Sequence, residues 1–359
     1  MIDPNNSTPK HQQLKDYLKN QILRGEISPG EKLDSENSLA SLFKLSRHTV
    51  RQALGELEND GFIYREKGRG SFCSPIGKTS VQNIAILTTY ISDYIFPTII
   101  RGVEEVLSNT GYNLILANTN NNKDKEAQCL ENFLSQGIDA LIIEPTKSAL
   151  ENSNERYFRE IEAKKIPYLM LHACYDGFNS AYLMMDDTQG SYLATKYLLQ
   201  LGHRRIAGLF KSDDQQGIKR KTGFLKALQE FGLPDIPEFL GYYTTEQLHS
   251  YPCQYIRNLL QKENRPTAIV CYNDQIALEV LEVIRNEVLK VPDDISIVGF
   301  DDSSLATATE IKLTTVKHPK AEMGRQAARS IIEMLTGRIE QPCFIYPSEL
   351  IVRSSCRNI

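Results

Sequence analysis

Residues 46–73 read SRHTVRQALGELENDGFIYREKGRGSFC and predict a helix followed by a β-hairpin. Ser46 is a preferred N-cap residue, and Gly61 supplies the left-handed position at which many helices end. Between them, apolar residues recur at helical spacing and predict one buried face: Val50, Ala53, Leu54 and Leu57. The segment FIYREKGRGSFC then predicts two short strands around a glycine-rich tip.

Two more helices are predicted on the N-terminal side of this stretch. The apolar residues of the first helix, which ends near Gly25, are Leu14, Tyr17, Leu18, Ile22 and Leu23. Ser35 offers an N-cap for the second, with Ser38 where a capping box usually has Glu. The apolar residues that mark this second helix are Leu39, Leu42 and Phe43. Three helices followed by a hairpin indicate a winged helix-turn-helix, which is a DNA-binding fold.

The charge of this segment is informative locally rather than as a total. Residues 1–72 contain 11 Lys and Arg against 10 Asp and Glu, a net charge of +1. The rest of the chain contains 30 against 35, a net charge of −5. The basic residues of the segment gather at the start of the third helix and on the hairpin: Lys44, Arg47, His48, Arg51, Arg65, Lys67 and Arg69. Helix N-termini favour phosphate and Arg bonds bidentately to guanine, so this grouping favours DNA binding over a merely solvated basic face.

The motif PGEKLDSENSLASLFKLSRHTVRQALGELENDGFIYREKGRGSF resembles the DNA-binding domain of the GntR family across nearly all of residues 10–72. Asp34 replaces the usual Pro, and Ser71 replaces the usual Thr of the hairpin. The resemblance implies helix contacts to DNA from Lys10, Ser35, Glu36, Ser46, Arg47, His48, Thr49 and Arg51. It implies minor-groove contacts from the hairpin, or wing, by Lys67, Arg69 and Gly70.

The stretch SPIGKTSVQ, residues 74–82, reads as a linker between residues 1–73 and residues 83–359. After it, apolar runs alternate with helical runs: NIAILTT, YNLILAN, DALIIEP and YLMLHAC, then RIAGLF, FLGYYTT, TAIVCYND and SIVGFDD. Apolar strands separated by helices indicate parallel sheets buried on both faces. The predicted architecture is therefore an N-terminal winged helix and an α/β effector domain of two lobes with a cleft between them.

Polar side chains stand where several of these strands end. The residues concerned are Thr89, Tyr90, Glu144, His172, Asn273 and Asp301, and Arg220 opens a helix nearby. Carboxylates, an amide and a guanidinium pair well with adjacent hydroxyls, and an aromatic face suits the C–H side of a sugar. The set therefore favours a small polyhydroxy ligand at the carboxyl ends of the strands. The alternative is that each residue merely ends a strand or caps the next helix.

Residues 82–353 resemble the LacI/GalR effector domain, which has the periplasmic-binding-protein type I fold. The motifs that carry this resemblance are GHRRIAGL, KRKTGFLKAL, CYNDQIALEVL, VPDDISIVGFDD and LTTVKHPKAEMGRQAA. It implies ligand contacts from Arg220, three residues before Gly223, and from Asn273 and Asp301. His318 replaces the Gln that usually precedes the proline, so the role of that position in the family does not carry over.

A GntR head on a LacI-type body is an unusual pairing that resembles the arabinose-responsive repressors of Gram-positive sugar catabolism. The resemblance implies L-arabinose as the effector, whereas the residues alone indicate a small polyhydroxy compound. The expected protein is a homodimeric, cytoplasmic repressor of sugar-utilisation genes that binds a two-fold operator in duplex DNA and is released by sugar. Another sugar or a nucleoside as effector, or activation in place of repression, stays open.

Other classes of protein fit less well. A sugar-transport protein would need an export signal and no DNA-binding head. For an enzyme, the sequence contains no GxGxxG, P-loop, GxSxG or metal-ligand cluster, and the pairs Asp186–Asp187 and Asp301–Asp302 are poorly placed to act on one atom. No apolar run is long enough to span a membrane. We therefore expect no catalytic residue, metal or cofactor. The seven cysteines form no CxxC pair and are expected to be buried, reduced thiols.

Overall fold

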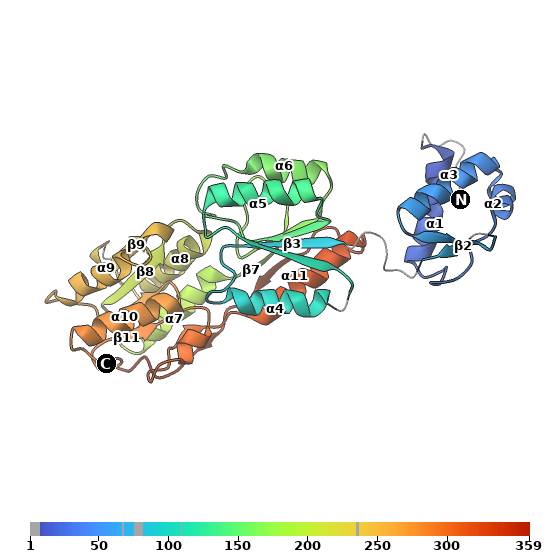
Figure 1. Ribbon diagram of the computed structural model, residues 1–359. Helices are drawn as coiled ribbons and strands as arrows, with labels where there is room; N and C mark the ends of the chain where they lie inside the picture. The colour runs from blue at the N-terminus through green and yellow to red at the C-terminus, as the bar shows by residue number, and fades with distance from the viewer. Residues whose placement is uncertain (1–7, 67, 75–81, 109, 235–236) are drawn as a thin grey trace. The chain divides into compact units, whose positions relative to one another are not determined.

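The computed structural model describes residues 8–66, 68–74, 82–108, 110–234 and 237–359 (Figure 1). It divides the chain into two compact units, Met1–Gln82 and, apart from Gly111–Asn113, the residues from Asn83 to Ile359. The predicted linker residues 75–81 lie outside the described residues. No helix in the described ranges is long and apolar enough to cross a membrane.

The first unit is the predicted winged helix. Its elements are α1 (Lys10–Leu23), α2 (Glu36–Phe43), α3 (Arg47–Asn59), β1 (Ile63–Glu66) and β2 (Gly70–Cys73). Both predicted caps form, because the Ser35 hydroxyl accepts from the Ser38 amide and the Ser46 hydroxyl accepts from the Thr49 amide. The strands pair antiparallel, and the buried faces of all three helices meet in one core. Leu42 follows the apolar spacing but is 66% exposed.

The N-terminal lobe of the second unit is built on a six-stranded sheet in the order β13-β7-β6-β5-β3-β4. Its strands are β3 (Asn83–Thr88), β4 (Asn113–Asn118), β5 (Ala140–Ile143), β6 (Tyr168–Leu171), β7 (Ala181–Met185) and β13 (Cys343–Tyr346). Helices α5 (Lys123–Gln136) and α6 (Glu155–Ala163) cover one face, and α4 (Phe96–Leu107) and α11 (Lys320–Leu335) cover the other (Figure 1). Burial on both faces explains why the central strands β3, β5 and β6 are almost uniformly apolar, whereas the edge strands β4 and β13 are partly exposed.

The C-terminal lobe has a parallel four-stranded sheet in the order β11-β10-β8-β9. Its strands are β8 (Ile206–Lys211), β9 (Leu240–Tyr243), β10 (Ala268–Cys271) and β11 (Ser296–Val298). Alternate strand residues enter two separate cores. Ile206 and Val270 pack with α7 (Asp187–Gln200) and α8 (Gln215–Glu230). Ala207 and Ile269 pack with α9 (Tyr251–Leu260) and α10 (Asp274–Asn286). Single turns of 3-10 helix lie at Pro237–Phe239, Thr245–Gln247 and Ser304–Thr307.

The chain crosses between the lobes three times, and the sequence prediction missed most of the elements at these crossings. The first crossing joins β7 to α7. The second runs from β12 (Thr315–Val316) to α11, and the third from β13 back to β14 (Leu350–Ile351), which pairs with β12. The prediction that the cysteines are buried is confirmed for Cys73 and Cys271. It is wrong for Cys343, which is exposed on β13 at the sheet edge, and for the four that are half-buried: Cys129, Cys174, Cys253 and Cys356. The described cysteines are all free thiols.

Candidate ligand cavity and DNA-binding surface

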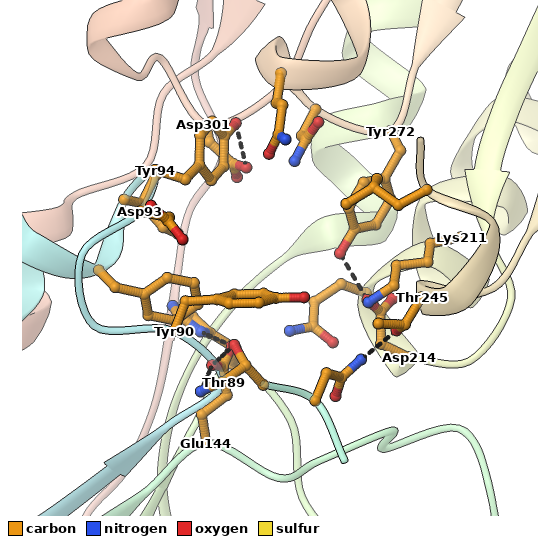
Figure 2. Close-up of a pocket in the computed structure, with 18 of the residues that line it drawn as sticks. Thr89, Tyr90, Asp93, Tyr94, Glu144, Lys211, Asp214, Thr245, Tyr272 and Asp301 are labelled. Atoms are coloured by element: carbon orange, nitrogen blue, oxygen red, sulfur yellow. Dashed lines mark hydrogen bonds and ion pairs between the residues drawn. The ribbon is translucent and has the colours of Figure 1, made fainter. Parts of the chain in front are cut away.

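A cavity of about 280 Å³ lies between the two lobes at the carboxyl ends of their strands. This volume lies just below the roughly 300–1,000 Å³ of pockets for drug-sized ligands, which suits a smaller molecule. Every residue that the sequence predicted for the ligand lines it: Thr89, Tyr90, Glu144, His172, Arg220, Asn273 and Asp301. Figure 2 shows side chains from both lobes arranged around the open centre.

Arg220 is the central cation of the cavity, and it is buried. Its Nε donates to Asp187 Oδ1 over 2.8 Å, and its Nη2 donates to Asp301 Oδ1 over 3.2 Å. The guanidinium also lies 3.6 Å from the ring centroid of Phe300. Burial alone would lower the pKa of Arg220, but the two carboxylates raise it above its ordinary value. The side chain is therefore a fixed, fully charged donor.

Asp301 joins the lobes through its carboxylate. Its Oδ2 accepts from the Tyr94 hydroxyl over 2.8 Å, and Tyr94 lies in the loop before α4 of the other lobe. The backbone of Asp301 is strained, with a φ of 91°, and Lys320 Nζ donates to its carbonyl oxygen over 2.8 Å. Strained residues of this kind persist where surrounding contacts over-determine them, often at ligand sites. A ligand that touches Asp301 therefore contacts a group linked to both lobes.

The N-terminal lobe contributes a second polar group around Glu144. Glu144 Oε2 accepts from both the amide and the hydroxyl of Thr89, over 3.0 and 2.5 Å. Glu144 Oε1 lies 2.9 Å from His172 Nδ1. Glu144 and His172 are both buried. These contacts fix the carboxylate and the imidazole at the floor of the cavity before any ligand arrives.

A third group, Lys211 with Asp214 and Tyr272, was not predicted from the sequence. Lys211 Nζ lies 3.1 Å from Asp214 Oδ2, and the Tyr272 hydroxyl donates to the same oxygen over 2.7 Å. Burial alone would raise the pKa of Asp214, but Lys211 and these hydrogen bonds hold it below its ordinary value. Little in the sequence singles out Asp214 as a cavity residue. It caps α8 by accepting from the Gly217 amide, and an Asp before a helix is already explained by that role.

Asn273 caps a helix, as the alternative interpretation of the sequence allowed, and also faces the cavity. The helix is α10, and Asn273 Oδ1 accepts from the Ile276 amide over 2.9 Å. The cap fixes the rotamer of Asn273 and leaves its side-chain NH₂ group for a ligand acceptor.

Direct contacts also tie the lobes together at the edge of the cavity, where Asn121 and Thr245 belong to its lining. Asn121 Nδ2 donates to Thr245 Oγ1 over 2.5 Å, and Lys147 forms an ion pair with Glu246. Asn121 and Lys147 lie in the N-terminal lobe, whereas Thr245 and Glu246 follow β9 in the C-terminal lobe. Opening the cleft would break these contacts, so they favour the arrangement seen here.

In the winged helix, the first turn of α3 presents Arg47 and His48 as exposed side chains, with Thr49 half-buried. Arg51, one turn on, is held by Glu36 of α2: its Nη2 donates to Glu36 Oε2 over 2.9 Å, and its Nε lies 3.2 Å from both carboxylate oxygens. This ion pair lowers the pKa of Glu36. The structure therefore brings two predicted DNA contacts together as one pre-oriented unit.

The remaining predicted DNA contacts lie at exposed ends of elements. Lys10 is the first residue of α1, and Ser35 and Ser46 are N-caps. In the wing, Arg69 pairs with Glu66, and Gly70 has a φ of 116° that favours glycine. Lys67 lies outside the described residues.

Comparison with known proteins agrees with both units. The model described as bacterial regulatory proteins, gntR family, matches residues 10–73, and the periplasmic binding protein-like domain matches residues 195–356. The arabinose metabolism transcriptional repressor of Geobacillus stearothermophilus is 50% identical over 358 residues, which is 98% of each chain. The chain belongs to this repressor family.

A second arabinose metabolism repressor, from Halalkalibacterium halodurans, is 46% identical over 96% of each chain. The crystal structure of a LacI family regulator from Enterococcus faecium with bound ribose is similar with a TM-score of 0.67 and 25% identity. It covers 77% of this chain and 100% of that one. As an arabinose repressor family member, the protein is a DNA-binding transcriptional repressor with a GntR-type head and a LacI-type effector domain.

Proposed function

We propose that the cavity binds L-arabinose and that the bound sugar releases the winged helix from its operator. The observation that carries this proposal is the Arg220–Asp301–Tyr94 arrangement, in which a buried charged pair is hydrogen-bonded across the two lobes. A pentose hydroxyl at Asp301 would compete with or reinforce that link, which gives the ligand different affinities for two lobe arrangements. The bound ribose in the Enterococcus faecium relative supports a pentose.

For the DNA side, we propose that residues 1–73 read the operator, that residues 74–82 are the linker and that residues 83–359 sense the sugar. Arg47, His48 and Arg51 enter the major groove, and the wing contacts the minor groove through Lys67, Arg69 and Gly70. The remaining head contacts are Lys10, Ser35, Glu36, Ser46 and Thr49. The effector domains form a homodimer in the cytoplasm, since a two-fold operator matches a two-fold protein.

The proposal is tested with the full chain and an operator selected from random duplexes. We expect saturating L-arabinose to weaken operator binding by about 5- to 150-fold in a fluorescence anisotropy titration, the usual range of allosteric coupling. The enantiomer D-arabinose is the matched control and should have little effect. Operator binding that is unchanged by L-arabinose would refute the effector claim, and a panel of other sugars and nucleosides would then identify the ligand.

Asp301→Asn tests the site itself. The amide keeps the shape of the side chain but removes the charge that Arg220 needs, so calorimetry should find L-arabinose binding weakened by at least about tenfold. Operator binding without sugar should be retained. The control is Asp302→Asn, because Asp302 pairs with Arg353 over 2.6 Å and is not a lining residue of the cavity. Equal losses in both variants would contradict the assignment of Asp301.

A further inference from the structure

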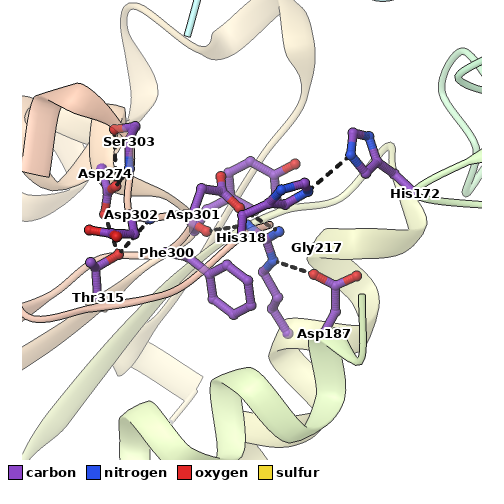
Figure 3. Close-up of polar contacts among 12 residues, drawn as sticks. His172, Asp187, Gly217, Asp274, Phe300, Asp301, Asp302, Ser303, Thr315 and His318 are labelled. Atoms are coloured by element: carbon purple, nitrogen blue, oxygen red, sulfur yellow. Dashed lines mark hydrogen bonds and ion pairs between the residues drawn. The ribbon is translucent and has the colours of Figure 1, made fainter. Parts of the chain in front are cut away.

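A chain of three buried side chains runs from Glu144 through His172 to His318 on one side of the cavity. His172 Nδ1 lies 2.9 Å from Glu144 Oε1, and His172 Nε2 lies 3.0 Å from His318 Nε2 (Figure 3). His318 is only 4% exposed and lines the cavity. Its second ring nitrogen, Nδ1, is buried and has no hydrogen-bond partner among the described residues. A buried polar atom without a partner is costly, and a water or a sugar hydroxyl that bonded this nitrogen would remove that cost.

The contact between the two Nε2 atoms allows only two proton arrangements while His318 is neutral. Glu144 is an acceptor, so His172 Nδ1 carries a hydrogen in both. When His172 is neutral, its Nε2 accepts from His318 Nε2–H, and His318 Nδ1 is an acceptor. When His172 is protonated, its Nε2–H donates to His318 Nε2, and His318 Nδ1 must carry the hydrogen and become a donor. One proton on His172 therefore reverses the polarity of His318 Nδ1.

We propose that His318 Nδ1 bonds an oxygen of the bound sugar, and that protonation of His172 decides whether this nitrogen donates or accepts. The proposal rests on the proposed function in that it takes the cavity to be the sugar site. It makes His318 a contact residue and His172 a positioning residue that acts through it.

The surrounding charges keep the two imidazoles in different states. Burial opposes protonation of His172, but Glu144, Asp187 and Asp301 raise its pKa above the ordinary value. Burial, together with the positive charges of His172, Lys320 and Arg220, holds the pKa of His318 well below that value. The pair therefore gains its single proton on His172, and His318 stays neutral. The φ of 64° at His172, with its amide donating to Leu183 O over 2.9 Å, holds the ring in this place.

The arrangement explains why a hydroxyl is a suitable group for this position. A hydroxyl both donates and accepts, so it satisfies His318 Nδ1 in either proton state. A fluorine can only accept, so it is satisfied only while Nδ1 donates. Selectivity between a hydroxyl and a fluorine at this position should then depend on pH.

The first test measures the histidine tautomers directly. In full-length protein labelled with ¹⁵N-histidine, long-range ¹H–¹⁵N spectra report which ring nitrogens carry hydrogen. As the pH rises from 5 to 9, we expect His172 to lose a proton and neutral His318 to change from the Nδ1–H to the Nε2–H form together with it. His172→Gln should abolish the change at His318. A His318 tautomer that stays constant while His172 titrates would overturn the proposal.

The second test measures binding of L-arabinose analogues in which one hydroxyl at a time is replaced by fluorine. For the analogue that carries fluorine opposite His318, we expect the affinity to fall by about tenfold from acid to alkaline pH, against little change for L-arabinose. His318→Gln, whose amide both donates and accepts, should bind L-arabinose but lose this pH dependence. If no analogue behaves so while L-arabinose binds, the sugar contact is wrong. If L-arabinose fails to bind but the tautomers still change, the proposed function fails and the proton coupling stands.

Discussion

At the residue scale, the DNA-binding head depends on one arginine that is oriented before DNA is present. Glu36 holds Arg51 through both Nε and Nη2, which reduces the rotamer entropy that Arg51 loses on binding. If Arg51 reads a base, Arg51→Ala should reduce operator affinity by about 1–3 kcal/mol and relax the base preference at one position. Glu36→Gln should cause a smaller loss, because the guanidinium remains but is less well held. Anisotropy titrations against selected and random duplexes measure both effects.

The matched control for Arg51 is Arg24→Ala. The Arg24 side chain lies in the turn after α1 and is 75% exposed, and its ion pair with Glu26 is long, at 4.0 Å. Removing this side chain should therefore leave operator binding unchanged. A loss for Arg51→Ala that is equal on selected and random duplexes would make Arg51 a phosphate contact instead.

A second residue-scale prediction concerns stability and pH. The pKa of His172 is raised in the folded protein above the ordinary value of 6.5, despite the opposing effect of burial. A raised pKa means that folding favours the protonated form, so this stabilisation is fully present below pH 6.5 and is lost as the pH rises through the folded pKa. Compared with His172→Gln, the native protein should therefore lose unfolding free energy over that interval in denaturant titrations. If the unfolding free energy of the native protein instead rose relative to that of His172→Gln toward alkaline pH, the assignment would be contradicted.

The sequence predicted the strand-end residues of the cavity better than the loop residues that contact them. Strand ends such as Glu144 and Asp301 are visible as polar breaks in apolar runs, and all of the predicted ligand residues line the cavity. Tyr94 and Asn121 lie in loops, where no periodicity marks which side chain turns inward. His318 was set aside because it departs from the family pattern, although its position in the cavity follows directly from the crossing between β12 and α11.

At the element scale, the close contact of α4 with α11 depends on a reciprocal pair of glycines. A Cβ atom on Gly102 would overlap the carbonyl oxygen of Ala321, and one on Gly324 would overlap that of Ile99. Gly324→Ala should therefore force the helices apart and destabilise the protein by about 1–3 kcal/mol, as overpacking usually does. Thermal and denaturant unfolding of the full chain measure this loss.

Gly55→Ala is the matched control for this prediction. Gly55 lies within α3 with nothing within 4 Å of its added Cβ, so the same change should stabilise the helix by about 0.5–1 kcal/mol. The double variant Gly102→Ala, Gly324→Ala should cost less than the sum of the single changes, because one displacement of the helices relieves both overlaps. Additive costs would mean that the helices do not move as units.

The elements themselves were predicted where a local pattern sufficed. The winged helix has caps, spacing and a glycine-rich turn within a short segment, and all of its elements form as expected. The predictions did not include β7 and α7, which meet at Asp186 and Asp187. In the sequence, nothing near these two adjacent acids indicates that they have separate roles. In the structure Asp186 caps α7 and Asp187 binds Arg220, a contact 33 residues away that no local pattern reveals.

At the scale of the whole molecule, the net charge of −4 is the sum of two parts with different roles. The acidic effector domain outweighs a head whose basic groups are few but gathered at α3 and the wing. Because binding to DNA depends on local phosphate contacts, the salt dependence should follow those groups and not the net charge. If Lys10 contacts a phosphate, Lys10→Ala should reduce the slope of log affinity against log salt by about 0.9, equally for selected and random duplexes. An unchanged slope would remove Lys10 from the interface.

The two lobes also set a constraint on regulation that involves the whole chain. If L-arabinose weakens operator binding by a given factor, the operator must weaken L-arabinose binding by the same factor. The contacts beside the cavity decide how readily the lobes adopt the sugar-binding arrangement, and Thr245 is central because its hydroxyl accepts from Asn121 and donates to Asp213 over 2.7 Å. Thr245→Val keeps the shape of the side chain but removes both bonds.

We therefore expect Thr245→Val to weaken L-arabinose binding by about 5- to 10-fold, since a larger share of molecules would have the cleft open. Calorimetry with and without operator, and anisotropy with and without sugar, should still give equal coupling factors. Thr222→Val is the control, because the Thr222 hydroxyl bonds to Ile218 O within α8. Unchanged sugar affinity in Thr245→Val would separate these contacts from lobe closure. Unequal coupling factors would mean that sugar and operator do not act on one shared equilibrium, since linkage in a single equilibrium requires them to match.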